Sequence, residues 1–241
     1  MEYERLGIGN TAEILNFGEG KICKLFRSNY PKESVKREYD NLKIANQLGI
    51  PCPHVYELVE INGRFGVVED LLKGETILSK IKRRERVDEL MNTMVEIQEK
   101  MISRQSTLCM SYKDFLRECV YGKVAADDII YQEIDELPED DYICHGDYHP
   151  DNVLIDEDNC YYVIDFMNLC KGPKLYDVAR TYFLISKGEM PRNMSAEDQA
   201  QLVKMQRQLG KMYLDKIRIQ EEQLQEYLHV IEKCRVYEIQ S

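Results

Sequence analysis

A segment at residues 145–156, HGDYHPDNVLID, limits the possible folds of this 241-residue chain more than any other feature. Asp147 and Asn152 lie five residues apart in a loop that a proline stiffens, and an apolar run follows directly. The turn composition DEDN separates this run from a second one, which ends in the sequence IDF with Asp165. We therefore predict a hairpin over residues 153–164, with two carboxylates and one amide converging at its mouth.

Phosphoryl transfer requires such a set of groups. A carboxylate positions the attacking hydroxyl and takes its proton, while hard oxygen ligands hold the Mg²⁺ that neutralises the phosphates. Asp147 suits the base, and Asn152 and Asp165 suit the metal. Asp and Asn are also common in turns, but three polar residues at this spacing, followed by two apolar strands, are hard to produce by chance. The pattern favours a catalytic site.

On these residues the sequence resembles the aminoglycoside phosphotransferase and choline kinase family, small-molecule kinases with a protein-kinase-like fold. The resemblance is specific in HGDYHPDNVLID and YYVIDF and looser in the first seventy residues. It implies an α+β, bilobal fold, with a small antiparallel-sheet N-terminal lobe carrying one helix and a larger, mainly helical C-terminal lobe. By this resemblance Asp147 is the catalytic base, Asn152 and Asp165 bind Mg²⁺, and Asp177 supports the catalytic loop.

The first seventy residues predict strands and one helix. Two pairs of apolar runs are joined by glycine-containing turns at residues 18–20 and 62–63, which predicts two hairpins and four strands. Between the hairpins, apolar residues recur at three- and four-residue intervals. This spacing predicts an amphipathic helix that begins at Ser34 and ends before Gly49.

The sequence pattern after residue 70 predicts mainly helices. This change of pattern divides the whole chain into an N-terminal nucleotide-binding lobe, 1–70, and a C-terminal catalytic and acceptor-binding lobe, 71–241. The helical segments are 76–103, 112–125, the part after Pro173, and 196–238, in which Gly210 is the expected weak point.

Lys24 and Glu38 are the predicted ion pair of the first lobe. Lys24 has apolar neighbours in its strand, so an unpaired ammonium group would be costly to bury there. Glu38 shares a helix face with apolar residues and therefore points toward the sheet. The pair would place the ammonium group on the α- and β-phosphates of a nucleotide. The alternative is that Lys24 ends an edge strand in water and Glu38 is a surface charge.

Other nucleotide contacts are predicted in two places. The first loop has only two glycines of a G-x-G-x-x-G pattern, because Ala12 stands at the third position, and a lone G-x-G is also a common turn. The resemblance implies a hinge near residue 70 whose backbone binds the purine edge; it does not distinguish ATP from GTP. The expected contacts are Gly9, Asn10 and Thr11 for phosphates, backbone groups of Glu69 and Leu71 for the purine edge, and Leu154 for the floor of the base pocket.

Composition restricts the partners. The formal net charge is -11, which repels phosphate backbones and anionic lipids, so we expect neither nucleic acid nor membrane as a partner. No stretch approaches the ~20 apolar residues of a membrane helix, and the N-terminus has no signal-like apolar region. Eight scattered cysteines without a C-x-x-C pair predict free thiols in the cytoplasm rather than disulfides or a zinc site. The oligomeric state is open.

Three functions are consistent with these residues. The first is a small-molecule kinase that uses Mg²⁺ and ATP or GTP to phosphorylate a hydroxyl group. The second is a protein kinase, which is disfavoured because the loop reads His-Gly-Asp and only eleven residues separate Asp165 from Asp177. The third is an inactive kinase-like binding module, which is disfavoured because every expected catalytic residue is present.

The acceptor cannot be named from the sequence. An acidic run before the catalytic loop comprises Glu133, Asp135, Glu136, Glu139, Asp140 and Asp141. Such a run is usually a solvated surface. If it borders the acceptor site together with Glu221, Glu222 and Glu226, it favours a cationic acceptor, such as an aminoglycoside or an amino alcohol.

Overall fold

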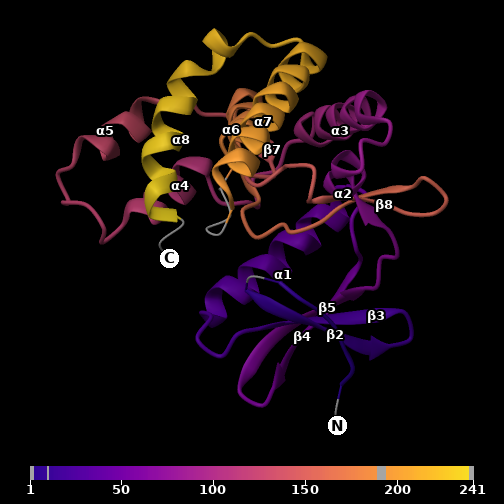
Figure 1. Ribbon diagram of the computed structural model, residues 1–241. Helices are drawn as coiled ribbons and strands as arrows, with labels where there is room; N and C mark the ends of the chain where they lie inside the picture. Colours follow the sequence, from indigo (N-terminus) through magenta and orange to yellow (C-terminus); the bar gives the residue numbers. More distant parts are fainter. Residues whose placement is uncertain (1–2, 10, 189–193, 239–241) are drawn as a thin grey trace. The chain divides into compact units, whose positions relative to one another are not determined.

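The computed structural model describes residues 3–9, 11–188 and 194–238 (Figure 1). The chain forms two compact units. The first comprises Met1–Ser79 and Asp151–Met167, and the second comprises Lys80–Pro150 and Asn168–Ser241. This division differs from the predicted lobe boundary at residue 70, because the segment after Pro150 returns to pair with the first unit.

The main sheet of the first unit contains the two predicted hairpins. Its antiparallel strand order is β1-β2-β3-β5-β4. The turn between β4 and β5 uses Asn62 and Gly63 with φ of 51° and 74°, the left-handed backbone that a tight hairpin turn requires. The bounds are β1 (Arg5–Ile8), β2 (Ala12–Gly18), β3 (Lys21–Phe26), β4 (Val55–Ile61) and β5 (Arg64–Asp70). β1 is an additional strand; three of its four residues are exposed, so it lacks an alternating pattern.

The predicted helix of the first unit is α1 (Lys32–Gln47), which packs against β4 and β5. It begins two residues earlier than expected, and its buried face includes Val35, Glu38 and Leu42, as the spacing predicts. The same unit also contains the predicted hairpin of β8 (Val153–Ile155) and β9 (Tyr161–Val163).

A short strand joins that hairpin to the rest of the first unit. β6 (Glu75–Thr76) pairs with β8 in a three-stranded sheet of order β6-β8-β9. Val163 of β9 also donates its backbone N–H to the Pro51 carbonyl at 2.8 Å. These contacts explain why residues 151–167 group with the N-terminal part. α2 (Ile77–Lys82) then leads into the second unit.

The second unit is mainly helical. Helix α6 packs against α7, α8 and the strand β7, and β7 pairs with β10 in a two-stranded sheet. None of the helices in the described part of the chain is long and apolar enough to cross a bilayer. The bounds are α3 (Val87–Ile102), α4 (Tyr112–Val120), α5 (Ile129–Glu136), β7 (Tyr142–Cys144), β10 (Cys170–Gly172), α6 (Lys174–Lys187), α7 (Ala196–Ile217), the 3₁₀ helix η1 (Glu221–Leu224) and α8 (Gln225–Glu238).

Two helix predictions need correction. The segment 76–103 is two helices, because the chain turns between them with Arg84 and Arg86 in left-handed backbone. The segment 196–238 breaks after α7, at Arg218 with φ 59°, and not at Gly210. Gly210 lies buried inside α7, where a Cβ would come within 2.8 Å of the Ser186 Cβ of α6. The glycine therefore permits close packing of two helices instead of weakening one.

Candidate active site

The predicted catalytic loop of the second unit is held at Gly146. This residue follows β7, and its N–H donates to Asp177 Oδ1 at 3.0 Å while its carbonyl accepts from Arg180 Nε at 2.8 Å. Both partners lie on α6, one turn apart. Gly146 has φ of 74°, and a Cβ here would collide with the Asn168 carbonyl, so the loop requires glycine at this position.

Asp147, the predicted base, directly follows Gly146. Its Oδ2 lies 3.7 Å from His149 Nε2, and its backbone N–H donates to His145 Nδ1 at 3.2 Å. Burial raises the pKa of Asp147, but the interaction with His149 and nearby positive charges, including Arg180, outweigh burial and hold that pKa below its usual range. The carboxylate is therefore ionised at neutral pH and can accept a hydrogen bond from a hydroxyl group.

A buried polar network lies behind this loop. Asp177 is fully buried, and its Oδ2 accepts from Gln98 Nε2 at 2.8 Å. Gln98 also donates to Thr181 Oγ1 at 2.9 Å and accepts from the Tyr213 hydroxyl at 2.7 Å. Burial raises the pKa of Asp177, while the N–H of Gly146 opposes that rise. The predicted contact of Asp177 with the catalytic loop is present in the structure.

Sequence reasoning missed Gln98 and Arg180. Gln98 shares the buried face of α3 with Met91, Met94 and Met101. A polar side chain within such an apolar stripe is a signal that could have indicated a buried partner. Arg180 is buried one turn after Asp177 in an otherwise apolar helix segment, which is a similar signal.

The first unit brings together Lys24, Glu38 and Asp165. Lys24 Nζ lies 2.6 Å from Glu38 Oε1 and 3.4 Å from Asp165 Oδ1. Burial lowers the pKa of the Lys24 ammonium group, but the surrounding carboxylates, Glu38 foremost, outweigh burial and hold that pKa above its ordinary value. Since β3 lies between β2 and β5, Lys24 is not at a sheet edge. The predicted ion pair is therefore present, and the edge-strand alternative is wrong.

Glu69 adds a further carboxyl group to this environment. Burial raises the pKa of Glu69 to about 8, against the opposing charge of Lys24. The sequence analysis considered only the backbone of this residue. Near neutral pH its side chain is therefore mostly protonated.

Asp165 is held in a strained backbone conformation. Its φ is 65°, the left-handed region that non-glycine residues rarely adopt. The backbone after it is fixed by Asn41 of α1, whose Nδ2 donates to the Phe166 carbonyl at 2.8 Å and to the Met167 carbonyl at 3.2 Å. The Asp165 side chain stays 42% exposed, so a ligand can reach its carboxylate. Asn41 was missed by the sequence analysis, although it is a polar residue next to Leu42 in the predicted helix.

The two predicted metal ligands lie in the same unit. Asn152 is buried immediately before β8, and its backbone carbonyl accepts from Ile164 N–H at 3.0 Å. This bond brings Asn152 beside the residue that precedes Asp165. One amide and one carboxylate fit Mg²⁺, which commonly takes one or two carboxylates and completes its shell with phosphate oxygens and water. No cluster of three or more His, Cys, Asp or Glu side chains suited to a metal occurs among the described residues.

The predicted nucleotide contacts are partly occupied by the fold itself. Gly9 donates its N–H to the Ala12 carbonyl at 2.8 Å, and Leu71 donates its N–H to the Gly20 carbonyl at 2.8 Å. These two amides are therefore engaged within the first unit. Thr11 is exposed, and Asn10 lies outside the described residues. Glu69 lies in β5, and Leu154 lies in β8 opposite Tyr162 and Thr76.

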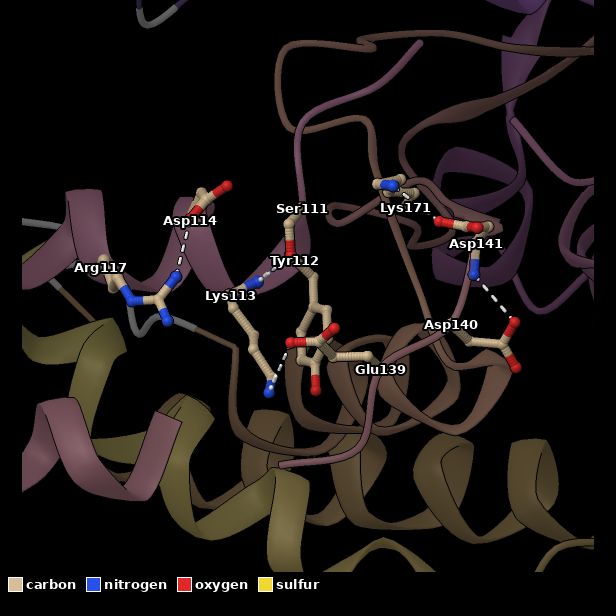
Figure 2. Close-up of a pocket in the computed structure, with 9 residues that line it drawn as sticks. All are labelled: Ser111, Tyr112, Lys113, Asp114, Arg117, Glu139, Asp140, Asp141 and Lys171. Carbon is tan, nitrogen blue, oxygen red and sulfur yellow. Dashed lines mark hydrogen bonds and ion pairs between the residues drawn. The ribbon is translucent and has the colours of Figure 1, made fainter. Parts of the chain in front are cut away.

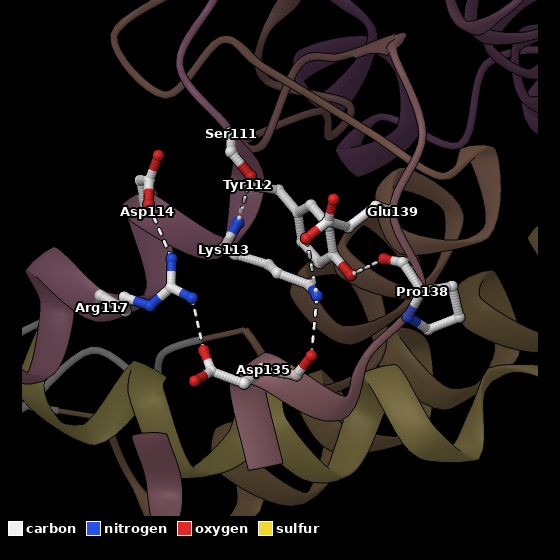
Figure 3. Close-up of polar contacts among 8 residues, drawn as sticks. All are labelled: Ser111, Tyr112, Lys113, Asp114, Arg117, Asp135, Pro138 and Glu139. Atoms are coloured by element: carbon white, nitrogen blue, oxygen red, sulfur yellow. Dashed lines mark hydrogen bonds and ion pairs between the residues drawn. The ribbon is translucent and has the colours of Figure 1, made fainter. Parts of the chain in front are cut away.

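The acidic run is largely neutralised by bases of the second unit. Glu139 pairs with Lys113 at 3.2 Å, and Asp135 pairs with Arg117 (Figure 3). Asp141 pairs with Lys171 at 2.6 Å at a pocket of about 500 Å³ (Figure 2). The side chains that line this pocket are basic, acidic or uncharged. The basic ones are Lys113, Arg117 and Lys171, the acidic ones are Asp114, Glu139, Asp140 and Asp141, and the uncharged ones are Ser111 and Tyr112. Glu133 is likewise bound by Lys233 at 2.6 Å.

Glu226 of the last helical segment lies far from the predicted catalytic loop. Glu226 is at the start of α8, whereas Glu238, at its other end, bonds to Arg180 and so lies near Gly146. Twelve residues of α-helix separate the two glutamates, about 18 Å. The ion pairs of the acidic run therefore favour the solvated-surface interpretation for that run, and the cationic acceptor stays a prediction.

Comparison with known proteins identifies a matching family. Residues 112–216 match the model of the phosphotransferase enzyme family. The resemblance seen in the sequence is confirmed. A search of the curated proteins finds no match.

Solved structures show the same fold over 95–96% of the chain. An aminoglycoside-3′-phosphotransferase of type VIII is 17% identical with a TM-score of 0.61, over 96% of this chain and 93% of its own. The aminoglycoside phosphotransferase APH(3″)-Id from Streptomyces rimosus is 14% identical with a TM-score of 0.58, over 95% and 91%. APH(2″)-IIa, solved with streptomycin and ATP, is 16% identical with a TM-score of 0.55, over 95% and 81%. The chain therefore has the predicted α+β, kinase-like fold of aminoglycoside phosphotransferases, with an antiparallel sheet in the N-terminal region and a helical C-terminal part.

Proposed function

We propose that this protein is a small-molecule kinase that transfers the γ-phosphate of ATP or GTP to a hydroxyl group. The observation that carries the proposal is the position of Lys24 between Glu38 and Asp165, at 2.6 and 3.4 Å. An ammonium group held this way can bind phosphate oxygens, and the exposed carboxylate beside it can bind a divalent cation. The match to a phosphotransferase family supports the same reaction.

In this proposal Asp147 is the catalytic base. The acceptor hydroxyl donates a hydrogen bond to the ionised carboxylate, and its oxygen attacks the γ-phosphorus. The bond from the γ-phosphorus to the bridging oxygen breaks, the nucleoside diphosphate leaves, and the hydroxyl proton passes to Asp147. Because the pKa of this carboxyl group is low, its main contribution is to orient the hydroxyl group.

Asn152 and Asp165 would hold Mg²⁺ in this reaction. The ion supplies positive charge that neutralises the nucleotide phosphates. Lys24, oriented by Glu38, contacts the α- and β-phosphates. We further propose phosphate contacts at Gly9, Asn10 and Thr11, purine contacts at the backbone of Glu69 and Leu71, and Leu154 beneath the base. Since the amides of Gly9 and Leu71 are engaged within the fold, their contribution would come from other backbone atoms or from a rearranged loop.

The structure argues against a protein kinase. Protein kinases carry arginine where this chain has Gly146. Here any side chain would meet left-handed backbone and the Asn168 carbonyl. Only eleven residues separate Asp165 from Asp177, which leaves little room for a long activation segment. A small molecule is therefore the proposed acceptor, and aminoglycosides and amino alcohols are the first compounds to test.

An acceptor screen tests the proposal. Release of ADP or GDP is followed with a library of hydroxyl compounds, with and without Mg²⁺, and Asp147→Asn serves as the inactive control. We expect acceptor-dependent release that the variant lacks. Phosphorylation of protein substrates alone would indicate a protein kinase. Nucleotide binding without transfer to any acceptor would indicate a binding module, and either result would overturn the proposal.

A further inference from the structure

A buried ion pair connects the last helix of the second unit to the catalytic loop. Arg180 lies on α6 with 1% of its side chain exposed, and Glu238 is the last residue of α8 with 15% exposed. Arg180 Nη2 donates to Glu238 Oε1 at 2.5 Å, while its Nε donates to the Gly146 carbonyl at 2.8 Å. One guanidinium group therefore contacts both the end of the last helix and the residue before Asp147.

This arrangement is costly as a purely structural feature. Burying Arg180 and Glu238 has a large desolvation penalty, which a well-packed apolar pair would avoid. Arg235 Nη1, 2.9 Å from Glu238 Oε1, offsets part of that penalty. Arg180 Nη1 and Glu238 Oε2 also have no hydrogen-bond partner within the described residues, which adds to the cost. The Phe115 ring lies 5.5 Å from Arg180 Cζ and offsets part of it. A function that depends on the position of the guanidinium group would account for a charged pair at this place in the fold.

The Arg180 guanidinium group and the Asp177 carboxylate together bond both polar backbone groups of Gly146. Asp177 accepts the Gly146 N–H, and Arg180 donates to the Gly146 carbonyl, so α6 holds both polar backbone groups of this glycine. The bond to Glu238 constrains the plane of the guanidinium group, because its donors form a rigid fork. Glu238 thereby limits how far the Gly146 carbonyl can move.

We propose that Arg180 and Glu238 are positioning residues for phosphoryl transfer, which hold the backbone that carries Asp147. This inference rests on the proposed function of Asp147. A displacement of about 1 Å at a reacting group can cost about 10²-fold in rate, so a positional role of this kind affects turnover strongly. The residues that we propose for nucleotide phosphates and metal belong to the first unit, so nucleotide affinity does not depend on this pair.

The decisive experiment compares two glutamates of the same helix. Glu238→Gln keeps the shape of the side chain and removes its charge. Glu232→Gln is the matched control, because Glu232 forms an exposed ion pair with Lys187 and therefore joins the same two helices without touching the catalytic loop. We expect Glu238→Gln to lower kcat about 10-fold with the nucleotide KM unchanged, and the control to retain nearly full kcat.

A second variant tests the fork itself. Arg180→Lys keeps the positive charge but cannot bond to Gly146 and Glu238 in the same geometry, and we expect kcat to fall about 10²-fold. The inference is overturned if Glu238→Gln behaves like the control. It is also overturned if kcat, nucleotide affinity and thermal stability decline together, because that pattern indicates general loosening of the fold.

Amide hydrogen exchange at Gly146, measured by NMR, separates this inference from the proposed function. We expect about 10-fold faster exchange in Glu238→Gln than in Glu232→Gln. The reason is that Arg180, no longer paired with a charged Glu238, holds the Gly146 carbonyl less firmly. Equal exchange in the two variants would refute positioning, whatever the activity. If the native protein transfers phosphate to no acceptor, the proposed function fails, and the inference about catalysis fails with it even when exchange is faster.

Discussion

Removal of the Asp177 carboxylate tests the buried network behind the catalytic loop. Asp177→Ala leaves two buried donors without their acceptor: the Gly146 N–H at 3.0 Å and Gln98 Nε2 at 2.8 Å. Each unsatisfied buried donor costs about 1–3 kcal/mol, and Gln98 keeps its bond to Thr181. The alanine variant also avoids the cost of burying the Asp177 carboxylate, and this offsets part of the loss in stability. We expect the free energy of unfolding to fall by about 3 kcal/mol.

Asp177→Asn provides the discriminating comparison. The asparagine keeps one oxygen for the Gly146 N–H, while its NH₂ group faces Gln98. Rotation of the Gln98 amide by 180° would present Oε1 to that NH₂ group and Nε2 to the Tyr213 hydroxyl, which can accept a hydrogen bond. The network can therefore reform, and we expect a loss of about 1 kcal/mol.

Urea unfolding followed by circular dichroism measures both effects. The exposed Asp114→Ala is the control, since it removes only a surface ion pair with Arg117 and should cost less than about 0.5 kcal/mol. A loss below about 1 kcal/mol for Asp177→Ala would refute the reasoning. So would an equal loss for the asparagine and alanine variants, because the retained acceptor would then have no value.

Three further predictions concern the candidate site. Asp147→Asn should bind nucleotide almost normally but lower kcat by about 10²-fold or more, and retention of more than a third of kcat would exclude this residue as the base. Asp165→Ala should make nucleotide affinity insensitive to Mg²⁺ in calorimetry, and an unchanged Mg²⁺ dependence would move the metal site elsewhere. Because the pKa of Glu69 is raised to about 8 in the folded protein, its contribution to stability is complete below the ordinary value of 4.5 and is lost as pH rises to about 8. Glu69→Gln should therefore gain stability relative to the native protein between pH 5 and 8, by at most about 1.4 kcal/mol per pH unit, and a pH-independent difference would contradict the raised pKa.

Local sequence signals predicted the hairpins and the ion pair well. Asn62 and Gly63 specify a turn through their own backbone preferences, and the spacing of α1 places Glu38 on the buried face. Lys24 then required a partner, because an unpaired charge in a central strand is costly. These conclusions depended on neighbours within a few residues, or on one elementary cost.

Predictions that depended on distant neighbours were less successful. Gly210 was expected to weaken a helix, but its contact with Ser186 of α6 makes its missing side chain useful for packing. The acidic run was considered as a surface for a cationic acceptor, but Lys113, Lys171 and Lys233 neutralise much of it. A charge in the sequence does not show which opposite charge folding will place beside it.

The sequence by itself determined which residue types can do chemistry here: a carboxylate and an amide five residues apart, a second carboxylate after a hairpin, and a lysine in a strand. Those features are encoded by spacing and by local backbone preference. Only the tertiary structure decided how Gly146 is held, because its partners Asp177 and Arg180 lie 31 and 34 residues away and Glu238 acts from 58 residues beyond Arg180. Burial sets the energy of such contacts, and a side chain becomes buried only when distant segments of the chain pack over it.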